Sequence, residues 1–173
     1  PAIAQRLEDS DSGVRWAALA ALDKLPPEAL VAQAPAIAQR LEHSDWGVRR
    51  AALEALDKLP PEALEAQAPA IAQRLEDSQL NVRRAALEAL DKLPSEALVA
   101  QAPAIAQRLE DSDYDVRRAA LKALDKLPSE ALVAQAPAIA QRLEDSDWGV
   151  REAALKALDK LPPEALEAQA PAI

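Results

Sequence analysis

Apolar residues recur along the chain with the spacing of two amphipathic helices in every 34 residues. Four of them lie on one stripe of a first helix, at intervals of three or four: Leu30, Ala34, Ile37 and Leu41. Four more give nearly the same spacing in a second helix: Val48, Ala52, Leu56 and Leu59. The pattern therefore predicts a helix–turn–helix unit with one apolar stripe on each helix.

The segments between these stripes carry helix start signals. Ser44 and Asp45 separate the two helices, and Asp45 is expected to cap the second helix by accepting a backbone N–H. The other connection reads LPPEAL or LPSEAL, which places proline at a helix start, where its missing N–H costs nothing. Pro35 is different because it falls inside the first helix, and we expect it to bend that helix.

This unit is repeated in tandem across the chain. The string PAIAQRLE begins every 34 residues, at Pro1, Pro35, Pro69, Pro103 and Pro137. The predicted repeats are 1–34, 35–68, 69–102, 103–136 and 137–170, with a partial sixth repeat at 171–173. A single helix pair cannot bury its apolar stripes, so the repeats are expected to stack into one repeat domain spanning 1–173.

The repeat resembles the HEAT family more than the tetratricopeptide family. Tetratricopeptide repeats need Trp, Gly, Tyr and Phe at fixed positions, and none is invariant here. The string LEDSDWGVREAALKAL, from Leu143 to Leu158, is similar to a HEAT repeat. The resemblance implies an all-α fold, an α-solenoid in which five 34-residue HEAT-like helix pairs form a right-handed superhelix.

The HEAT resemblance also assigns structural roles to invariant polar residues. The prolines at 35, 69, 103 and 137 match the kink position of the family. An acidic residue and an arginine are implied to form a hydrogen-bond ladder between repeats. The acidic residues are Asp9, Asp77, Asp111 and Asp145, and the arginines are Arg15, Arg49, Arg83, Arg117 and Arg151. His43 replaces the acidic residue in the second repeat, which puts one rung of the ladder in question.

Only 8 of the 34 positions vary among the five repeats, and four of these lie together. Positions 12, 16 and 20 of the repeat are spaced by four, so they share one face of the second helix, and position 13 lies beside them. This variable stripe holds every aromatic residue of the chain: Trp16, Trp46, Tyr114 and Trp148. By resemblance to HEAT solenoids, the second helices line the concave face.

We interpret the variable stripe as a protein-binding surface, because Trp, Tyr and Arg carry much of the binding energy in protein interfaces. The predicted binding residues are Trp16, Trp46, Arg50, Leu80, Asn81, Arg84, Tyr114, Asp115, Arg118 and Trp148. The alternative is drift on a tolerant surface of a structural spacer or self-stacking rod. The pattern also resembles artificial HEAT-like binders with a fixed consensus, and a recently duplicated natural gene would look the same.

Composition argues against other functions. The net charge of −9 disfavours binding to nucleic acid phosphates, and no apolar run is long enough for a membrane span. The chain has no cysteine, and His43 is its only histidine, so we predict neither a metal site nor a cofactor. The acidic turns lack the spacing of a calcium loop and are better explained as helix caps. We therefore expect no enzymatic activity, although a few HEAT proteins are enzymes.

The first and last repeats keep the apolar positions of the interior repeats. Solenoids normally end in repeats with a polar outer face. Two explanations stay open: the chain is a segment of a longer array, or its ends stack on other copies head to tail. The predicted partners are therefore a protein on the concave face and, through the ends, a second copy of the chain.

Overall fold

The computed structural model describes residues 2–22 and 24–169, and every regular element among them is helical. The chain divides into two compact units, Pro1–Leu93 and Pro94–Ile173. Within the described residues, no helix is both long enough and apolar enough to span a membrane.

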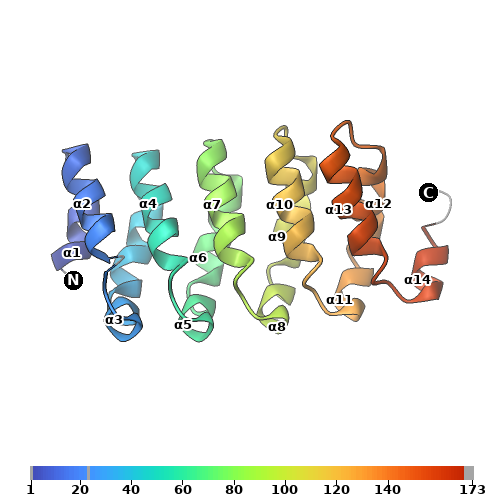
Figure 1. Ribbon diagram of the computed structural model, residues 1–173, viewed down its shortest axis with the longest axis horizontal. Helices are drawn as coiled ribbons and strands as arrows, with labels where there is room; N and C mark the ends of the chain where they lie inside the picture. Colours follow the sequence, from blue (N-terminus) through green and yellow to red (C-terminus); the bar gives the residue numbers. More distant parts are fainter. Residues whose placement is uncertain (1, 23, 170–173) are drawn as a thin grey trace. The chain divides into compact units, whose positions relative to one another are not determined.

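Unit 1 contains three second helices in a row, α2 (Ser12–Leu22), α4 (Trp46–Leu56) and α7 (Leu80–Leu90) (Figure 1). Helix α4 packs against both α2 and α7. The first-helix layer comprises α1 (Ala2–Gln5), η1 (Arg6–Glu8), α3 (Pro27–Ala38), η2 (Gln39–Glu42), α5 (Pro61–Glu65), α6 (Ala68–Gln73) and η3 (Arg74–Glu76).

Unit 2 repeats this arrangement with the second helices α10 (Tyr114–Leu124) and α13 (Trp148–Leu158), which pack against each other. Its other elements are α8 (Ser95–Val99), α9 (Ala102–Gln107), η4 (Arg108–Glu110), α11 (Ser129–Val133), α12 (Ala136–Gln141), η5 (Arg142–Glu144) and α14 (Pro163–Glu167). The predicted all-α architecture of repeated helix pairs is confirmed.

The repeated proline shapes the first helix in two ways. Helix α3 runs through Pro35, as the sequence predicts. In the next three repeats the helix is interrupted instead, and Pro69, Pro103 and Pro137 lie in the first turn of α6, α9 and α12. The N–H groups of a first helical turn have no partner within the helix, so a proline there costs no hydrogen bond. Starting a new helix at this point therefore avoids the lost hydrogen bond and the steric clash of a proline inside a helix. The expected bend is therefore a break in these three repeats.

Among the described residues, the buried hydrophobic side chains of each unit are those of alanine, leucine, isoleucine and valine. These residues occupy positions that are identical in all repeats, and the buried side chains include Leu41, Leu53 and Ile71 in unit 1 and Leu109, Leu121 and Ile139 in unit 2. Small alanines beside branched side chains let neighbouring helices approach closely. Among the described residues, no aromatic side chain is buried.

Aspartates cap four of the five second helices. The Oδ1 atom of Asp45 accepts from the N–H of Gly47 at 2.7 Å, and Asp113 accepts from Asp115 and Val116. Asp11 and Asp147 make the corresponding bonds. The acidic turns are thus occupied in holding helix starts, as predicted.

Gln79 stands at the fifth cap position and makes no side-chain cap hydrogen bond. Gln79→Asp should restore the bond and raise the free energy of unfolding by about 0.5–1 kcal/mol. Urea denaturation of the two proteins measures this difference. An unchanged midpoint would show that the cap site is already satisfied in another way.

Candidate protein-binding surface

The aromatic residues of the variable stripe lie on the solvent-facing side of the second helices. The exposed fractions are 66% for Trp16, 43% for Trp46, 48% for Tyr114 and 67% for Trp148. Each stands in the first or second turn of its helix, because positions 12 and 16 of the repeat fall there. The helices are held by aliphatic residues, so these aromatic rings are not needed to fill the core.

In unit 1, a hollow of about 280 Å³ lies between α2 and α4. It brings together Trp16, Trp46 and Arg50, three of the residues predicted to bind a partner. The rest of its wall consists of Ser12, Arg15, Leu19, Asp45, Gly47, Ala51 and Glu54. Two indole rings with an apolar floor and nearby charges can accommodate an apolar side chain flanked by polar groups.

A second hollow of about 250 Å³ extends this surface across α2, α4 and α7. It shares Trp16, Leu19 and Glu54 with the first hollow. Asp57, Lys58, Leu53, Ala85 and Glu88 complete its wall. The two hollows therefore form a continuous surface, which we call the unit 1 groove and define by the residues that line them.

Sequence reasoning identified only part of the unit 1 groove. Leu19 and Ala51 line the first hollow. They occupy invariant positions, and the predicted binding residues all lie at variable positions, so neither is among them. Leu80, Asn81 and Arg84 lie on α7 but do not line either hollow. The predicted residues thus do not all converge on one hollow.

The arginines of the stripe are paired with acidic residues on their own helices. Arg50 donates from Nε to Glu54 at 2.6 Å, and Arg84 lies 3.7 Å from Glu88. Arg118 donates to Asp115 at 2.7 Å. These pairs are at least partly exposed, so their net contribution to stability is small and a partner can compete for either charge.

In unit 2, the stripe brings Arg118 next to the start of α13. A Cβ atom added to Gly149 would lie 3.5 Å from Cδ of Arg118, so the arginine stem covers this glycine. Tyr114 and Trp148 begin the two helices on either side. Glycine at this position lets the guanidinium stem lie flat against the neighbouring helix.

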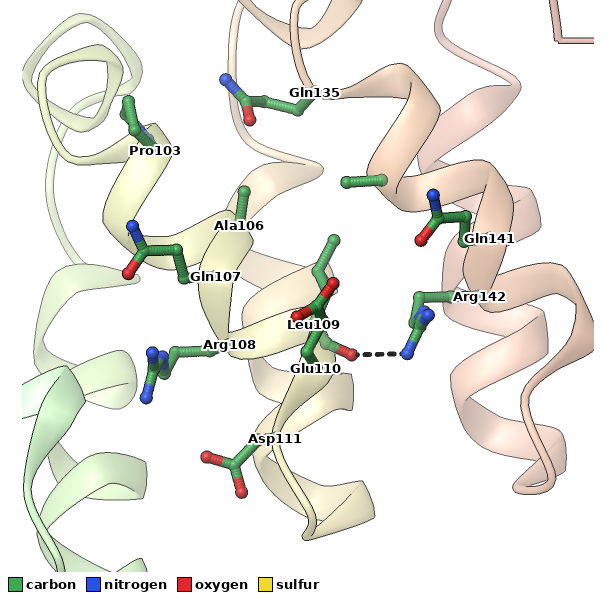
Figure 2. Close-up of a pocket in the computed structure, with 11 residues that line it drawn as sticks. Pro103, Ala106, Gln107, Arg108, Leu109, Glu110, Asp111, Gln135, Gln141 and Arg142 are labelled. Carbon is green, nitrogen blue, oxygen red and sulfur yellow. Dashed lines mark hydrogen bonds between the residues drawn. The ribbon is translucent and has the colours of Figure 1, made fainter.

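A hollow of about 660 Å³ lies elsewhere, between the first helices of unit 2 (Figure 2). Residues of α9 and η4 line it on one side and residues of α12 and η5 on the other, and Nη1 of Arg142 donates to the carbonyl of Leu109 at 2.9 Å. All its lining residues except Asp111 belong to positions that are identical in every repeat. This hollow contains none of the residues predicted to bind a partner.

A ladder of arginine–aspartate pairs joins successive repeats within each unit. Arg49 donates from Nε and Nη2 to the two carboxylate oxygens of Asp77, at 2.6 and 2.8 Å. Arg117 makes the same two-point contact with Asp145, at 2.8 Å for both bonds. Each arginine also donates to two backbone carbonyls of its own repeat, so it ties the turn to the next repeat.

His43 changes the first rung of this ladder. Its Nδ1 accepts from the N–H of Asp45, as a carboxylate oxygen of the aspartates at this position does, but an imidazole has no carboxylate for Arg15 to contact. Arg15 instead reaches Oδ2 of Asp45, at 3.5 Å. Arg15 thus makes one long contact with the capping Asp45, where Arg49 and Arg117 each make two short contacts with an aspartate. The first rung of the ladder is altered, as the sequence indicates.

His43→Asp should restore the two-point contact with Arg15, while Asp45 keeps its cap of α4 through Oδ1. We expect the free energy of unfolding to rise by about 1 kcal/mol at neutral pH. Thermal denaturation of both proteins tests this. His43→Asn is the matched control, since it can keep the local hydrogen bond without adding a charge, and an equal gain there would argue against the ladder.

The fold and these ladders define a helical repeat protein. Residues 34–102 and 102–172 match the family described as HEAT repeats, and residues 1–22 match a family described as a HEAT repeat associated with sister chromatid cohesion. The chain belongs to the HEAT repeat family. No curated protein matches the chain in sequence.

Several solved structures share the fold at low sequence identity. An engineered protein from the Northeast Structural Genomics Consortium is 22% identical with a TM-score of 0.77, covering 98% of this chain and 83% of its own. A designed armadillo repeat protein in complex with the peptide (KR)4 is 18% identical with a TM-score of 0.78. The match covers 99% of this chain and 89% of that one. A structure of computationally designed armadillo repeat proteins for modular peptide recognition is 17% identical with a TM-score of 0.75. The match covers 99% of this chain and 89% of that one.

Proposed function

We propose that this chain is a non-catalytic binding scaffold that recognises a protein or peptide segment on its second helices. The observation that carries the proposal is the exposure of every aromatic residue of the second helices, in unit 1 and in unit 2. None of them is buried, so packing of the described core does not depend on an aromatic side chain. Aromatic residues exposed together on one face are a common property of interaction sites.

The unit 1 groove is the best-formed part of this surface. Trp16 and Trp46 line the hollow between α2 and α4, with Leu19 and Ala51 among the apolar residues of its wall. The Arg50–Glu54 pair adds one charge of each sign. A partner segment that inserts an apolar side chain beside the indoles and offers polar groups to this pair fits the arrangement.

The structural neighbours support peptide binding as a use of this fold. The structure of one designed armadillo repeat protein is in complex with the peptide (KR)4, and others were computationally designed for modular peptide recognition. At 17–18% identity these proteins establish only the fold, so the partner of this chain follows from its own stripe. That stripe mixes aromatic, cationic and anionic side chains.

Panning a display library of random peptides against the immobilised full-length chain tests the proposal. We expect enriched peptides whose affinity falls at least about tenfold in Trp16→Ala and in Trp46→Ala. Val99→Ala is the control, since Val99 is 40% exposed at a variable position outside the second helices. Circular dichroism should show that all variants keep their helicity.

Two outcomes would overturn the proposal. A library that yields no enriched peptide would favour the structural spacer, in which the variable stripe binds nothing. Enriched peptides that bind both tryptophan variants as well as the parent would place recognition on another face.

A further inference from the structure

The second hollow of the unit 1 groove is lined mainly by acidic charge and lies at the end of α4. Among its lining residues, the carboxylates of Glu54, Asp57 and Glu88 stand against one ammonium group, that of Lys58. Asp57 is the C-cap residue of α4, and the carbonyl groups at a helix C-terminus carry partial negative charge. This end of the groove therefore favours a cation.

The fold does not require acidic residues at this place. Glu54 and Glu88 occupy position 20 of the repeat, where the first repeat has alanine and the fourth and fifth repeats have lysine. All five residues stand on an equivalent second helix. The acidic character of the hollow is therefore a property of unit 1 and not of the repeat.

Unit 2 shows how the aspartate that follows a second helix is paired. Asp125 is the C-cap residue of α10, as Asp57 is of α4. The carboxylate of Asp125 lies 2.9 Å from Nζ of Lys160 and 3.2 Å from Nζ of Lys156. Both lysines belong to the next repeat, so an aspartate at this position can hold two ammonium groups at once.

In unit 1 the corresponding aspartate has one of these two partners. Nζ of Lys92, the counterpart of Lys160, donates to Asp57 at 2.6 Å. The residue at the position of Lys156 is Glu88, so a carboxylate replaces the second ammonium group. The place that a lysine of the chain fills in unit 2 is therefore open to a cation from outside in unit 1.

Glu88 can accept a cation from a partner. Its ion-pair partner within the described residues is Arg84, one turn away at 3.7 Å, and the side chain of Glu88 is 62% exposed. An exposed pair at this distance contributes little, so it does not compete strongly with a new partner. Glu88 and Asp57 line the same hollow, and a cation between them would be attracted by both carboxylates.

We propose that the second hollow binds the charged group of a lysine or arginine side chain of the partner segment, an inference that rests on the proposed function. Trp16 and Leu19 line both hollows. The alkyl stem of the basic residue lies along them, and its charged group reaches Glu88 and Asp57. The partner is thus a segment with an apolar residue for the first hollow and a basic residue for the second.

Panning four peptide display libraries against the immobilised full-length chain tests this inference. The libraries have random flanking residues and differ only in a fixed central residue, which is lysine, arginine, leucine or glutamate. We expect enrichment from the lysine and arginine libraries. The enriched peptides should bind at least about tenfold more tightly than the same peptides with leucine at the centre.

Glu88→Lys is the decisive variant of the chain. It places an ammonium group beside Asp57, as Lys156 does beside Asp125, so it should fold normally while filling the cation site. Binding of the enriched basic peptides should fall at least about tenfold. Glu65→Lys is the matched control, because it changes the net charge equally at an exposed residue of α5 that lines neither hollow. It should bind as the parent does, and circular dichroism should show equal helicity in all three proteins.

Three results would overturn the inference. Peptides that need Trp16 but bind equally well with lysine, leucine or glutamate at the centre would refute the cation site and leave the proposed function standing. Unchanged binding of the basic peptides to Glu88→Lys would have the same meaning. A lack of enrichment from all four libraries would refute the cation site and the proposed function together.

Discussion

Leu121→Ala is expected to lower the free energy of unfolding by about 2–5 kcal/mol, whereas Leu155→Ala should change it by less than about 0.5 kcal/mol. Both residues occupy the same position of the repeat and both lie in unit 2. Leu121 is fully buried on α10, which packs against α13, whereas Leu155 is 56% exposed. The substitution removes the same atoms in both cases, so the difference measures what burial of the leucine side chain contributes.

Urea denaturation followed by circular dichroism measures both values. Equal losses in the two variants would contradict the conclusion that each repeat completes the core of its neighbour.

Arg117→Ala should lower the free energy of unfolding by about 2–4 kcal/mol, because it leaves the nearly buried carboxylate of Asp145 without its charge partner. The two side chains are only 11% and 5% exposed, and the same arginine satisfies the carbonyls of Asp111 and Ser112. Arg118→Ala is the matched control on the next residue, since that guanidinium is 52% exposed. It should cost less than about 1 kcal/mol.

The ladder also predicts how stability depends on pH. Burial raises the pKa of Asp145, but the hydrogen bonds from Arg117 and from the backbone of Asp147, with the arginine charge, hold it below the ordinary 3.8. The pKa of Asp77 is lowered in the same way by its hydrogen bonds from Arg49 and from the backbone of Gln79. The unfolded chain therefore takes up protons first as the pH falls. The ladder contributes fully above about pH 5 and is lost as the pH falls below 3.8 through the folded-state pKa.

Thermal midpoints measured between neutral and acid pH check this dependence. In Asp145→Asn the fall toward acid pH should be shallower than in the parent protein. An identical pH profile in the two proteins would mean that Asp145 ionises alike in the folded and unfolded states.

Most of the fold could be predicted from the sequence because the same pattern is repeated. The stripes that contain Ile37 and Val48 place apolar residues on one side of each helix, and five copies of such a unit must stack to bury them. Capping by Asp45 and the altered rung at His43 were also predictable, because both depend on a single residue type at a known place. The helix breaks at proline were harder to predict. Pro35 and Pro69 have similar flanking sequences, but Pro35 lies inside α3 and Pro69 lies in the first turn of α6.

The candidate site could be predicted only in part. Variation among the repeats correctly placed Trp16 and Trp46 on the surface of the second helices. The shape of the unit 1 groove depends on invariant residues such as Leu19 and on the spacing of neighbouring helices. Variation carries no information about invariant residues. The exposure of Leu155 likewise depends on its place in the array, because its local sequence matches that of Leu121.

Quenching of tryptophan fluorescence by acrylamide tests most directly whether the aromatic residues are presented to a partner. All three tryptophans lie in the variable stripe and the core has none, so the emission reports only on this surface. The folded protein should be quenched nearly as efficiently as the chain in concentrated urea. Strong protection in the folded protein at low concentration would show that the tryptophans hold the repeats together, and would contradict the assignment of this stripe to recognition.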